Sequence, residues 1–404
     1  MTPKRLIAAG LGVALAATVG LAPVASADAP TTFTIPKPTG PYRTGTTELH
    51  LVDSSREDPW VPGKRRELMV SVTYPAARVQ GYERAAWMPA AAAAHFDQNT
   101  SPGFGIEPGT IDWAGTRAWS RVGAPALPGK RPVVVFSPGF GVPRTLGTVL
   151  VEELASRGYV VVSIDHTHDA SEVEFPGGRV EVGAVPDLTT DVLKKVQATR
   201  IADNRYVLDQ LAVLRRGGNA DAEQRTLPRG LGRSMDLFRV GMFGHSAGGI
   251  AAAQTMDEDR RVDAGINLDG TFAWDAGNDL MPVAQTGVRR PFLLFGAGAT
   301  THLAHQSWKA FYENSTGWKL DLNVPAGEHF TFTDTIAVMP QLVAKGVVSP
   351  QIAEQLNGTV RYPARVLASE RVYVTAFFDQ HLRDIPRPVL WGQSPRHPDV
   401  EFVR

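Results

Sequence analysis

The stretch VGMFGHSAGG, residues 240–249, decides the fold. A short apolar run leads into Ser246, which has a glycine two positions before it and another two positions after it. A turn from a strand into a helix is so tight at such a serine that these two positions tolerate almost no side chain. The strain of this turn pushes the serine hydroxyl outward. The pattern therefore predicts Ser246 as a nucleophile between a buried strand and a helix.

A serine hydroxyl is a poor nucleophile unless a base takes its proton and a carboxylate orients that base. Behind a turn of this kind the partners follow in the chain order serine, acid, histidine. His329 lies in AGEHF, residues 326–330, a loop after the last strand of the predicted parallel sheet, and is the predicted base. His302 and His305, which precede a predicted helix, are interpreted as surface or capping residues.

The acid is predicted from the ends of two strands. Asp269 ends the predicted strand that contains residues 264–268 and precedes a glycine. The next strand, ending near Phe295, leads into GAGA with no carboxylate nearby. Asp269 is therefore predicted to hold the imidazole of the base, although an aspartate before glycine is also typical of a plain turn.

Ester hydrolysis also needs donors for the oxyanion of the tetrahedral intermediate. The backbone N–H of the residue after the nucleophile, Ala247, supplies one. The second is predicted in SPGFG, residues 137–141, where glycines let the backbone approach a substrate closely. We expect the Phe140 N–H to be this donor.

The order of the predicted elements indicates the fold class. Residues 49–53 and 67–74 are predicted to be antiparallel strands, and 85–94 a short helix. From Pro132 onward, strands alternate with helices, which indicates an α/β-hydrolase fold with a mainly parallel sheet covered on both faces. The predicted strands are 133–137, 159–164, 238–243, 262–268, 291–295 and 318–324, and the predicted helices are 146–157, 188–215, 249–256 and 362–382. Residues 46–404 are predicted to be one domain, preceded by an extended lead-in over residues 28–45.

The N-terminus has the pattern of an export signal. Lys4 and Arg5 precede an Ala- and Gly-rich apolar run over residues 6–21, and Ala25-Ser26-Ala27 offers a cleavage site of small residues. We therefore expect residues 1–27 to be removed and the mature chain to be secreted. The sequence contains 0 cysteines, which excludes disulfides, thiolate nucleophiles and cysteine-based metal sites.

Composition limits the partners. Hydrophobic residues make up 43% and charged residues 20% of the chain, as in an ordinary globular protein. Its 41 basic and 41 acidic side chains give a formal net charge of +0, which offers no argument for nucleic acid. We expect a small ester or lipid as substrate, no cofactor, no metal and no obligate protein partner. Residues 334–358 contain apolar side chains that either pack on the core, the preferred interpretation, or make transient contact with a lipid interface.

Beyond these motifs, the chain resembles the secreted platelet-activating factor acetylhydrolase family, the lipoprotein-associated phospholipase A2 type. The matching pieces are residues 66–76, 135–141, 162–166, 244–249, 268–270, 328–334 and 376–382. The resemblance implies calcium-independent hydrolysis of short or oxidised acyl chains from phospholipid-like esters, and it supports Asp269 as the acid. The chain departs from the family at Pro138, where the family usually has histidine before glycine.

The sequence thus predicts a secreted serine esterase that works through an acyl-enzyme. Three alternatives stay open: a cutinase-like polyester hydrolase, a general lipase or carboxylesterase, and a lipid-binding hydrolase homologue without catalysis. The last is disfavoured by the joint presence of Ser246, Asp269 and His329.

Overall fold

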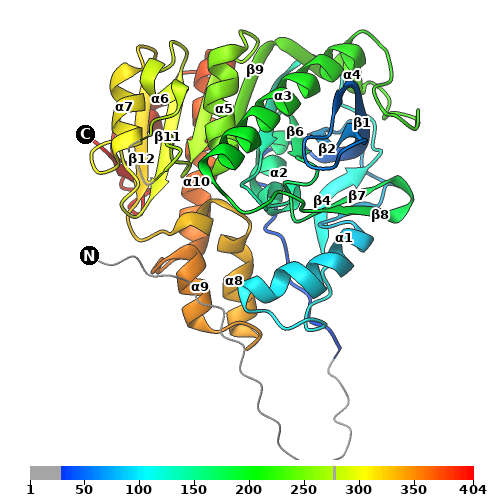
Figure 1. The fold of residues 1–404 in the computed structure, drawn as a ribbon. Helices are drawn as coiled ribbons and strands as arrows, with labels where there is room; N and C mark the ends of the chain where they lie inside the picture. Colours follow the sequence, from blue (N-terminus) through cyan, green and yellow to red (C-terminus); the bar gives the residue numbers. More distant parts are fainter. Residues whose placement is uncertain (1–28, 276–278) are drawn as a thin grey trace, which may run out of the picture.

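The computed structural model describes residues 29–275 and 279–404 (Figure 1). The predicted export signal, residues 1–27, lies outside the described residues. The described chain contains an 11-stranded sheet with the order β13-β12-β11-β10-β9-β5-β6-β2-β1-β4-β3, and a separate hairpin of β7 and β8. The strands are β1 (Thr44–Glu57), β2 (Arg65–Pro75), β3 (Arg84–Ala86), β4 (Arg117–Val122), β5 (Arg131–Ser137), β6 (Val160–Asp165), β7 (Glu172–Phe175), β8 (Arg179–Val182), β9 (Met235–His245), β10 (Ala264–Leu268), β11 (Phe292–Ala297), β12 (Lys319–Val324) and β13 (Glu401–Phe402).

Six neighbouring strands, β12 through β6 in the sheet order, run parallel. Antiparallel pairing extends the sheet beyond them, with β2 on β6 and β1 on β2, as predicted for the first two strands. The parallel strands are buried along almost their whole length because helices cover both faces, which is why they read as continuous apolar runs. The predicted mainly parallel sheet is confirmed.

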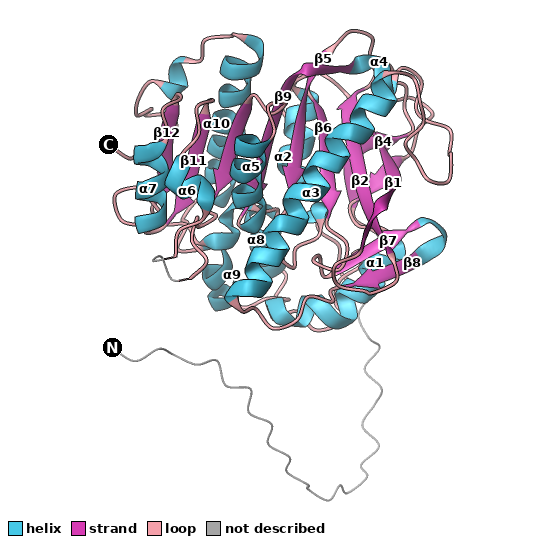
Figure 2. Ribbon diagram, turned by 45° about the horizontal axis from the view of Figure 1, so that its top comes forward, coloured by secondary structure: helices cyan, strands magenta, loops and turns pink. Residues whose placement is uncertain are grey.

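Helices form a layer on each face of the sheet (Figure 2). On one face α3 and α5 pack on a core that includes Leu211 and Ile250, and on the other α2 and α10 pack on a core that includes Leu154 and Phe377. This is the α/β-hydrolase architecture that the sequence predicts. The helices are α1 (Ala90–His95), α2 (Thr148–Ser156), α3 (Thr190–Arg215), α4 (Leu231–Ser234), α5 (Ala247–Glu258), α6 (Pro282–Thr286), α7 (Gln306–Asn314), α8 (Thr335–Ala344), α9 (Pro350–Asn357) and α10 (Pro363–Arg383). Within the described ranges, no helix has the length and apolarity needed to cross a bilayer.

A third apolar cluster joins α1, α8 and α9 at one end of the sheet (Figure 1). Trp87 and Trp113 stack there, and Ile336 and Leu342 of α8 are buried among them. The inner side chains of residues 334–358 therefore pack on a core, which was the preferred interpretation of that segment. The predicted helix over 85–94 is wrong in its first half, where β3 forms. The helix begins only after Pro89, because proline is accepted at a helix start but not inside one.

A buried ionic network lies behind the parallel strands. Arg66 on β2 donates to both carboxylate oxygens of Asp203 on α3, at 3.0 and 2.6 Å, and to Asp58 at 2.8 Å. Although burial alone would raise the pKa of Asp203, Arg66 and His166 hold this pKa below its ordinary value. His166, at the end of β6, joins the network through its Nδ1, 3.0 Å from Asp203. Arg66 thus serves two buried carboxylates at once, and Arg56 also donates to Asp203 over 3.0 Å.

Replacing Arg66 by methionine should lower the free energy of unfolding by about 3–5 kcal/mol, because Asp58 and Asp203 would lose the buried guanidinium that they share, and Asp203 would keep only the partly exposed Arg56 as a cationic partner. Urea denaturation of the purified protein measures this loss. The matched control is Arg239→Met, which breaks a half-exposed ion pair with Asp236 and should change stability by less than about 1 kcal/mol. Equal effects of the two substitutions would contradict the structural role of Arg66.

Candidate active site

Ser246 occupies a strained turn between β9 and α5. Its backbone has φ 55° and ψ −125°, a conformation that L-residues rarely adopt. A Cβ on Gly244 would lie 2.2 Å from the carbonyl carbon of Gly248, and a Cβ on Gly248 would lie 1.9 Å from the carbonyl oxygen of Ser137. Both positions therefore require glycine, for the steric reason that the motif predicts.

Asp269 directly follows β10, the strand beside β9. Its carboxylate is fixed on one side by the backbone N–H of Ala297, which donates to Oδ1 over 2.9 Å. The other oxygen, Oδ2, lies 2.6 Å from Nδ1 of His329. The strand ends are tied together as well, because the Ser246 N–H donates to the carbonyl oxygen of Leu268 over 2.8 Å. The orientation of the Asp269 carboxylate is thus fixed by the backbone and does not depend on His329 alone.

His329 begins a short 3₁₀ turn, residues 329–332, that follows β12. The turn is stabilised where it starts by a hydrogen bond from the Glu328 N–H to the Thr331 hydroxyl, 2.9 Å. Because a carboxylate only accepts, Nδ1 of His329 donates to Asp269, and this leaves Nε2 as the acceptor nitrogen. The His329 side chain is 44% exposed and that of Asp269 is 7% exposed, so the base is accessible while its partner is shielded.

All five residues that the sequence selected line one pocket of about 770 Å³: Ser246, His329, Asp269, Phe140 and Ala247. A volume of this size is typical of small-molecule sites. The rest of the lining is largely apolar and includes Leu188, Leu193, Ile250, Ala273, Trp274, Met281 and Ala297, with polar or charged contributions from Gln197, Thr271, Asp275, Thr300 and Glu328.

The loop after β5 approaches the nucleophile closely. A Cβ on Gly139 would lie 3.3 Å from Cβ of Ser246 and 3.0 Å from Nδ1 of His245. Phe140, the next residue, lines the pocket, and Ala247 is the first residue of α5, where backbone N–H groups have no partner within the helix. Two backbone donors are therefore available on the side of the pocket where Ser246 lies.

Three residues near the pocket were missed by sequence analysis. His245, inside the motif, is buried, and its Nε2–H donates to the carbonyl oxygen of His329 over 2.8 Å. Gln197 and Arg200 lie on α3. Their only sequence signal is that they are polar residues on the inward face of the helix, a property that they share with Asp203 and Asn204. The sequence analysis interpreted His302 and His305 as surface or capping residues. His302 is buried against Asp321, so its interpretation as a surface residue was wrong. His305 is the N-cap residue of α7.

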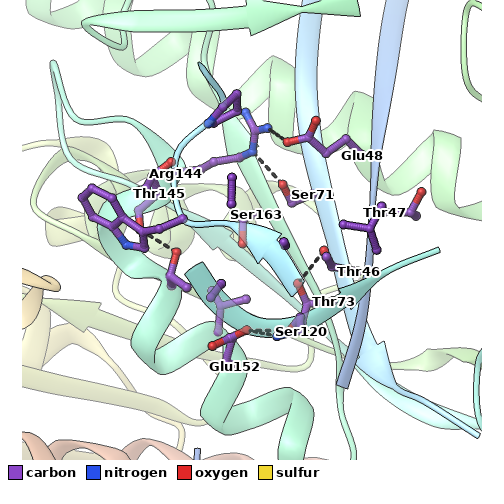
Figure 3. Close-up of a pocket in the computed structure, with 18 residues that line it drawn as sticks. Thr46, Thr47, Glu48, Ser71, Thr73, Ser120, Arg144, Thr145, Glu152 and Ser163 are labelled. Atoms are coloured by element: carbon purple, nitrogen blue, oxygen red, sulfur yellow. Dashed lines mark hydrogen bonds and ion pairs between the residues drawn. The ribbon is translucent and has the colours of Figure 1, made fainter. Parts of the chain in front are cut away.

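A second cavity, of about 220 Å³, lies between β1, β2, β4 and α2 (Figure 3). Its polar groups pair with one another: Arg144 with Glu48 and Ser71, Thr46 with Thr73, and Ser120 with Glu152. These pairs leave no activated nucleophile in the cavity, so we place the chemistry in the pocket at Ser246. The described residues also contain no group of three or more His, Cys, Asp or Glu side chains arranged to hold a metal ion.

The sheet order and the strand–turn–helix at Ser246 define the chain as an α/β hydrolase. Comparison with known proteins narrows this class. The family model for platelet-activating factor acetylhydrolase, isoform II, matches residues 28–175. A probable 1-alkyl-2-acetylglycerophosphocholine esterase from Arthroderma benhamiae is 31% identical over 93% of this chain and 95% of its own length.

A further relative and a solved structure are also similar to this chain. The platelet-activating factor acetylhydrolase of Cavia porcellus is 26% identical over 56% of this chain and 55% of its own length. A solved structure, a ferulic acid esterase from Streptomyces cinnamoneus, superposes with a TM-score of 0.73 at 38% identity, over 92% of this chain and 99% of that one. The chain belongs to the platelet-activating factor acetylhydrolase family and is an esterase, so the resemblance seen in the sequence is confirmed.

His245 makes the fold sensitive to acid. Burial lowers its pKa well below the ordinary value of 6.5, and the neighbouring His329 adds to this effect. Below pH 6.5 the His245 imidazole is protonated in the unfolded chain but stays neutral in the native protein. The free energy of unfolding therefore decreases as the pH falls. His245→Gln keeps an N–H donor for the His329 carbonyl but cannot titrate.

Between about pH 7.5 and about pH 5.5, the parent protein should therefore lose about 1 kcal/mol more unfolding free energy than His245→Gln. Urea denaturation at the two pH values measures the difference. The same pH dependence in both proteins would contradict a neutral, buried His245.

Proposed function

We propose that this protein is a secreted serine esterase that removes short acyl groups from phospholipid-like esters through an acyl-enzyme. The observation that carries the mechanism is the 2.6 Å hydrogen bond between His329 and Asp269 in the pocket that Ser246 also lines. The substrate class is supported by the 1-alkyl-2-acetylglycerophosphocholine esterase from Arthroderma benhamiae, which matches over nearly the whole chain.

In the acylation step, the Ser246 hydroxyl oxygen attacks the ester carbonyl carbon while Nε2 of His329 takes the hydroxyl proton. Asp269 accepts the Nδ1–H and stabilises the imidazolium that forms, and the carboxylate itself stays ionised. The tetrahedral intermediate then expels the alcohol, which leaves with the proton from Nε2. Water attacks the acyl-enzyme by the same route and releases the acid.

The negative charge of each intermediate resides on the former carbonyl oxygen. We assign the N–H groups of Phe140 and Ala247, which both line the pocket, as the donors to this oxygen, and each such donor lowers the barrier by about 3 kcal/mol. Since backbone amides carry no net charge, they stabilise the oxyanion without attracting a competing anion in the resting enzyme. The half-exposed His329 remains open to water for the second step.

An aromatic acyl ester is the second candidate substrate class. Trp274 and Phe140 both line the pocket, and the ferulic acid esterase that superposes on this chain is named for an aromatic ester substrate. Polyester hydrolysis and general carboxylesterase activity use the same chemistry and differ only in what the pocket admits.

Export is part of the proposal too, with cleavage near Ala27, and it rests on the basic, apolar and small-residue pattern of residues 1–27.

Ser246→Ala should reduce kcat on p-nitrophenyl acetate by about a millionfold, as removal of a triad nucleophile does. The variant should also escape labelling by a fluorophosphonate probe. Ser369→Ala, which removes a buried hydroxyl on α10 far from the pocket, is the matched control and should keep both activity and labelling. Residual turnover in Ser246→Ala near the parent level would overturn the mechanism.

A substrate panel tests the proposed class. A 2-acetyl phospholipid should give a kcat/KM at least about tenfold above that of a 2-hexadecanoyl phospholipid, because the relative that matches nearly the whole chain is named as a probable esterase of a 2-acetyl substrate. Methyl ferulate and a polyester film complete the panel. Trp274→Ala should selectively slow methyl ferulate if the aromatic class is the physiological one. A film or ferulate rate exceeding that of the acetyl phospholipid would replace the first proposal with that class.

A further inference from the structure

The carbonyl groups of the loop after β5 are bound by one side chain. Arg200 on α3 donates from Nη1 to the carbonyl oxygen of Pro138 over 2.6 Å, and from Nη2 to that of Gly139 over 3.0 Å. Arg200 is 1% exposed, so water does not compete for these bonds. The guanidinium thus holds two consecutive carbonyls of the loop on the side where α3 lies.

Arg200 is itself fixed by Asp169, which follows β6. Nε and Nη2 donate to the two carboxylate oxygens over 2.7 and 2.5 Å, a bidentate pair in which both side chains are buried. Asp169 is anchored through its own N–H, which donates to the His166 carbonyl over 3.0 Å. The Arg200 guanidinium, held by Asp169 through two hydrogen bonds in one plane, therefore has a nearly fixed orientation.

The carbonyl of Gly139 and the N–H of Phe140 belong to the same peptide unit. The described chain contains no cis peptide bond, and in a planar trans peptide these two groups point in opposite directions. With the carbonyl turned toward Arg200, the Phe140 N–H is turned away from α3. Among the described residues no acceptor takes this N–H, and Phe140 lines the pocket that contains Ser246.

The other oxyanion segment is also tied to α3. Gln197, one turn before Arg200 and on the same face of the helix, donates from Nε2 to the carbonyl oxygen of Ala247 over 3.2 Å. One face of α3 therefore contacts both chain segments that supply the backbone donors. The distance between those segments is set by a rigid helix and not by the loop alone.

We infer that Arg200, held by Asp169, is a positioning residue that fixes the Gly139–Phe140 peptide with its N–H aimed at the oxyanion. This inference rests on the proposed serine-esterase mechanism. The Gly139 carbonyl also accepts the Val142 N–H over 3.2 Å. The charged fork of Arg200 adds to this restraint at a residue that has no Cβ to restrict its rotation. An unsupported peptide would turn its carbonyl toward the pocket part of the time and repel the oxyanion, whereas a fixed one presents a preorganised donor.

Arg200→Lys tests the inference, because lysine keeps the charge opposite Asp169 but cannot bind that carboxylate and two carbonyls in one plane. We expect kcat on p-nitrophenyl acetate to fall by about a hundredfold with KM within about threefold, as when one oxyanion donor is lost. The inhibition constant of a trifluoromethyl ketone, whose serine adduct carries an oxyanion, should rise in parallel with the loss in kcat/KM. A non-covalent alcohol product should bind as before.

The chain offers a matched control in Arg371 on α10. It is 8% exposed, lies 3.7 Å from Glu153, and donates to two consecutive carbonyls, those of Pro36 and Lys37, over 3.0 and 3.2 Å. Arg371→Lys therefore disturbs the same kind of buried fork at a place remote from the pocket. It should lower the melting temperature but leave kcat and the ketone inhibition constant within about threefold of the parent values.

All rates are expressed per active site, counted by fluorophosphonate labelling run to completion. Equal rate losses in Arg200→Lys and Arg371→Lys, or an unchanged ketone inhibition constant in Arg200→Lys, would overturn the inference. If the fluorophosphonate probe labels no active sites in Arg200→Lys, Asp169→Asn is tested in its place. Its rate loss is compared with that of Arg371→Lys, and its ketone inhibition constant with that of the parent enzyme. Failure of the parent enzyme to react with the probe would instead remove the proposed function itself, so the two failures are distinguishable.

Discussion

The steric constraint at the Ser246 turn determines much of the site. Three backbone segments meet there: the end of β9, the start of α5 and the end of β5. They pack so closely that neither Gly244 nor Gly248 has room for a Cβ, and a Cβ on Gly248 would clash with the Ser137 carbonyl. The turn also binds the end of β10 through the hydrogen bond from the Ser246 N–H to Leu268. This close packing therefore brings three groups together: the predicted nucleophile Ser246, Leu268 beside the predicted acid Asp269, and the loop that contains Phe140.

The two sides of the pocket differ in rigidity and polarity. Behind the donors lies a buried ionic region in which Arg200 pairs with Asp169, and Arg66 with Asp203. Such pairs add little net stability over apolar packing, but each has one satisfactory geometry, so they specify where the backbone lies. On the opposite side, His329 is half-exposed on a short turn. This arrangement suits a reaction in which the donors must already be in position while substrate and water reach the base.

Much of the fold and the site could be predicted from local patterns. Buried parallel strands have continuous apolar runs, so their existence and their parallel direction followed from the alternation with helices, and glycine spacing selected Ser246. The β7–β8 hairpin and β4 were missed because such short strands carry weak periodicity. The first half of residues 85–94 was assigned wrongly because alanine favours helix in general, while Pro89 and pairing with β4 decide the local structure there. Arg200 was missed because its partners are backbone carbonyls, which have no sequence signature.

The sequence by itself determined the chemistry that the chain can perform: a serine in a glycine-framed turn, an aspartate at a strand end and a histidine in a later loop. These depend on local sterics and on chain order, both of which are written in the sequence. Only the tertiary structure decided that Asp269 reaches His329 at 2.6 Å and that α3 holds both donor segments. Such contacts join residues 50 or more positions apart, and their geometry arises only when the sheet and its helices pack together.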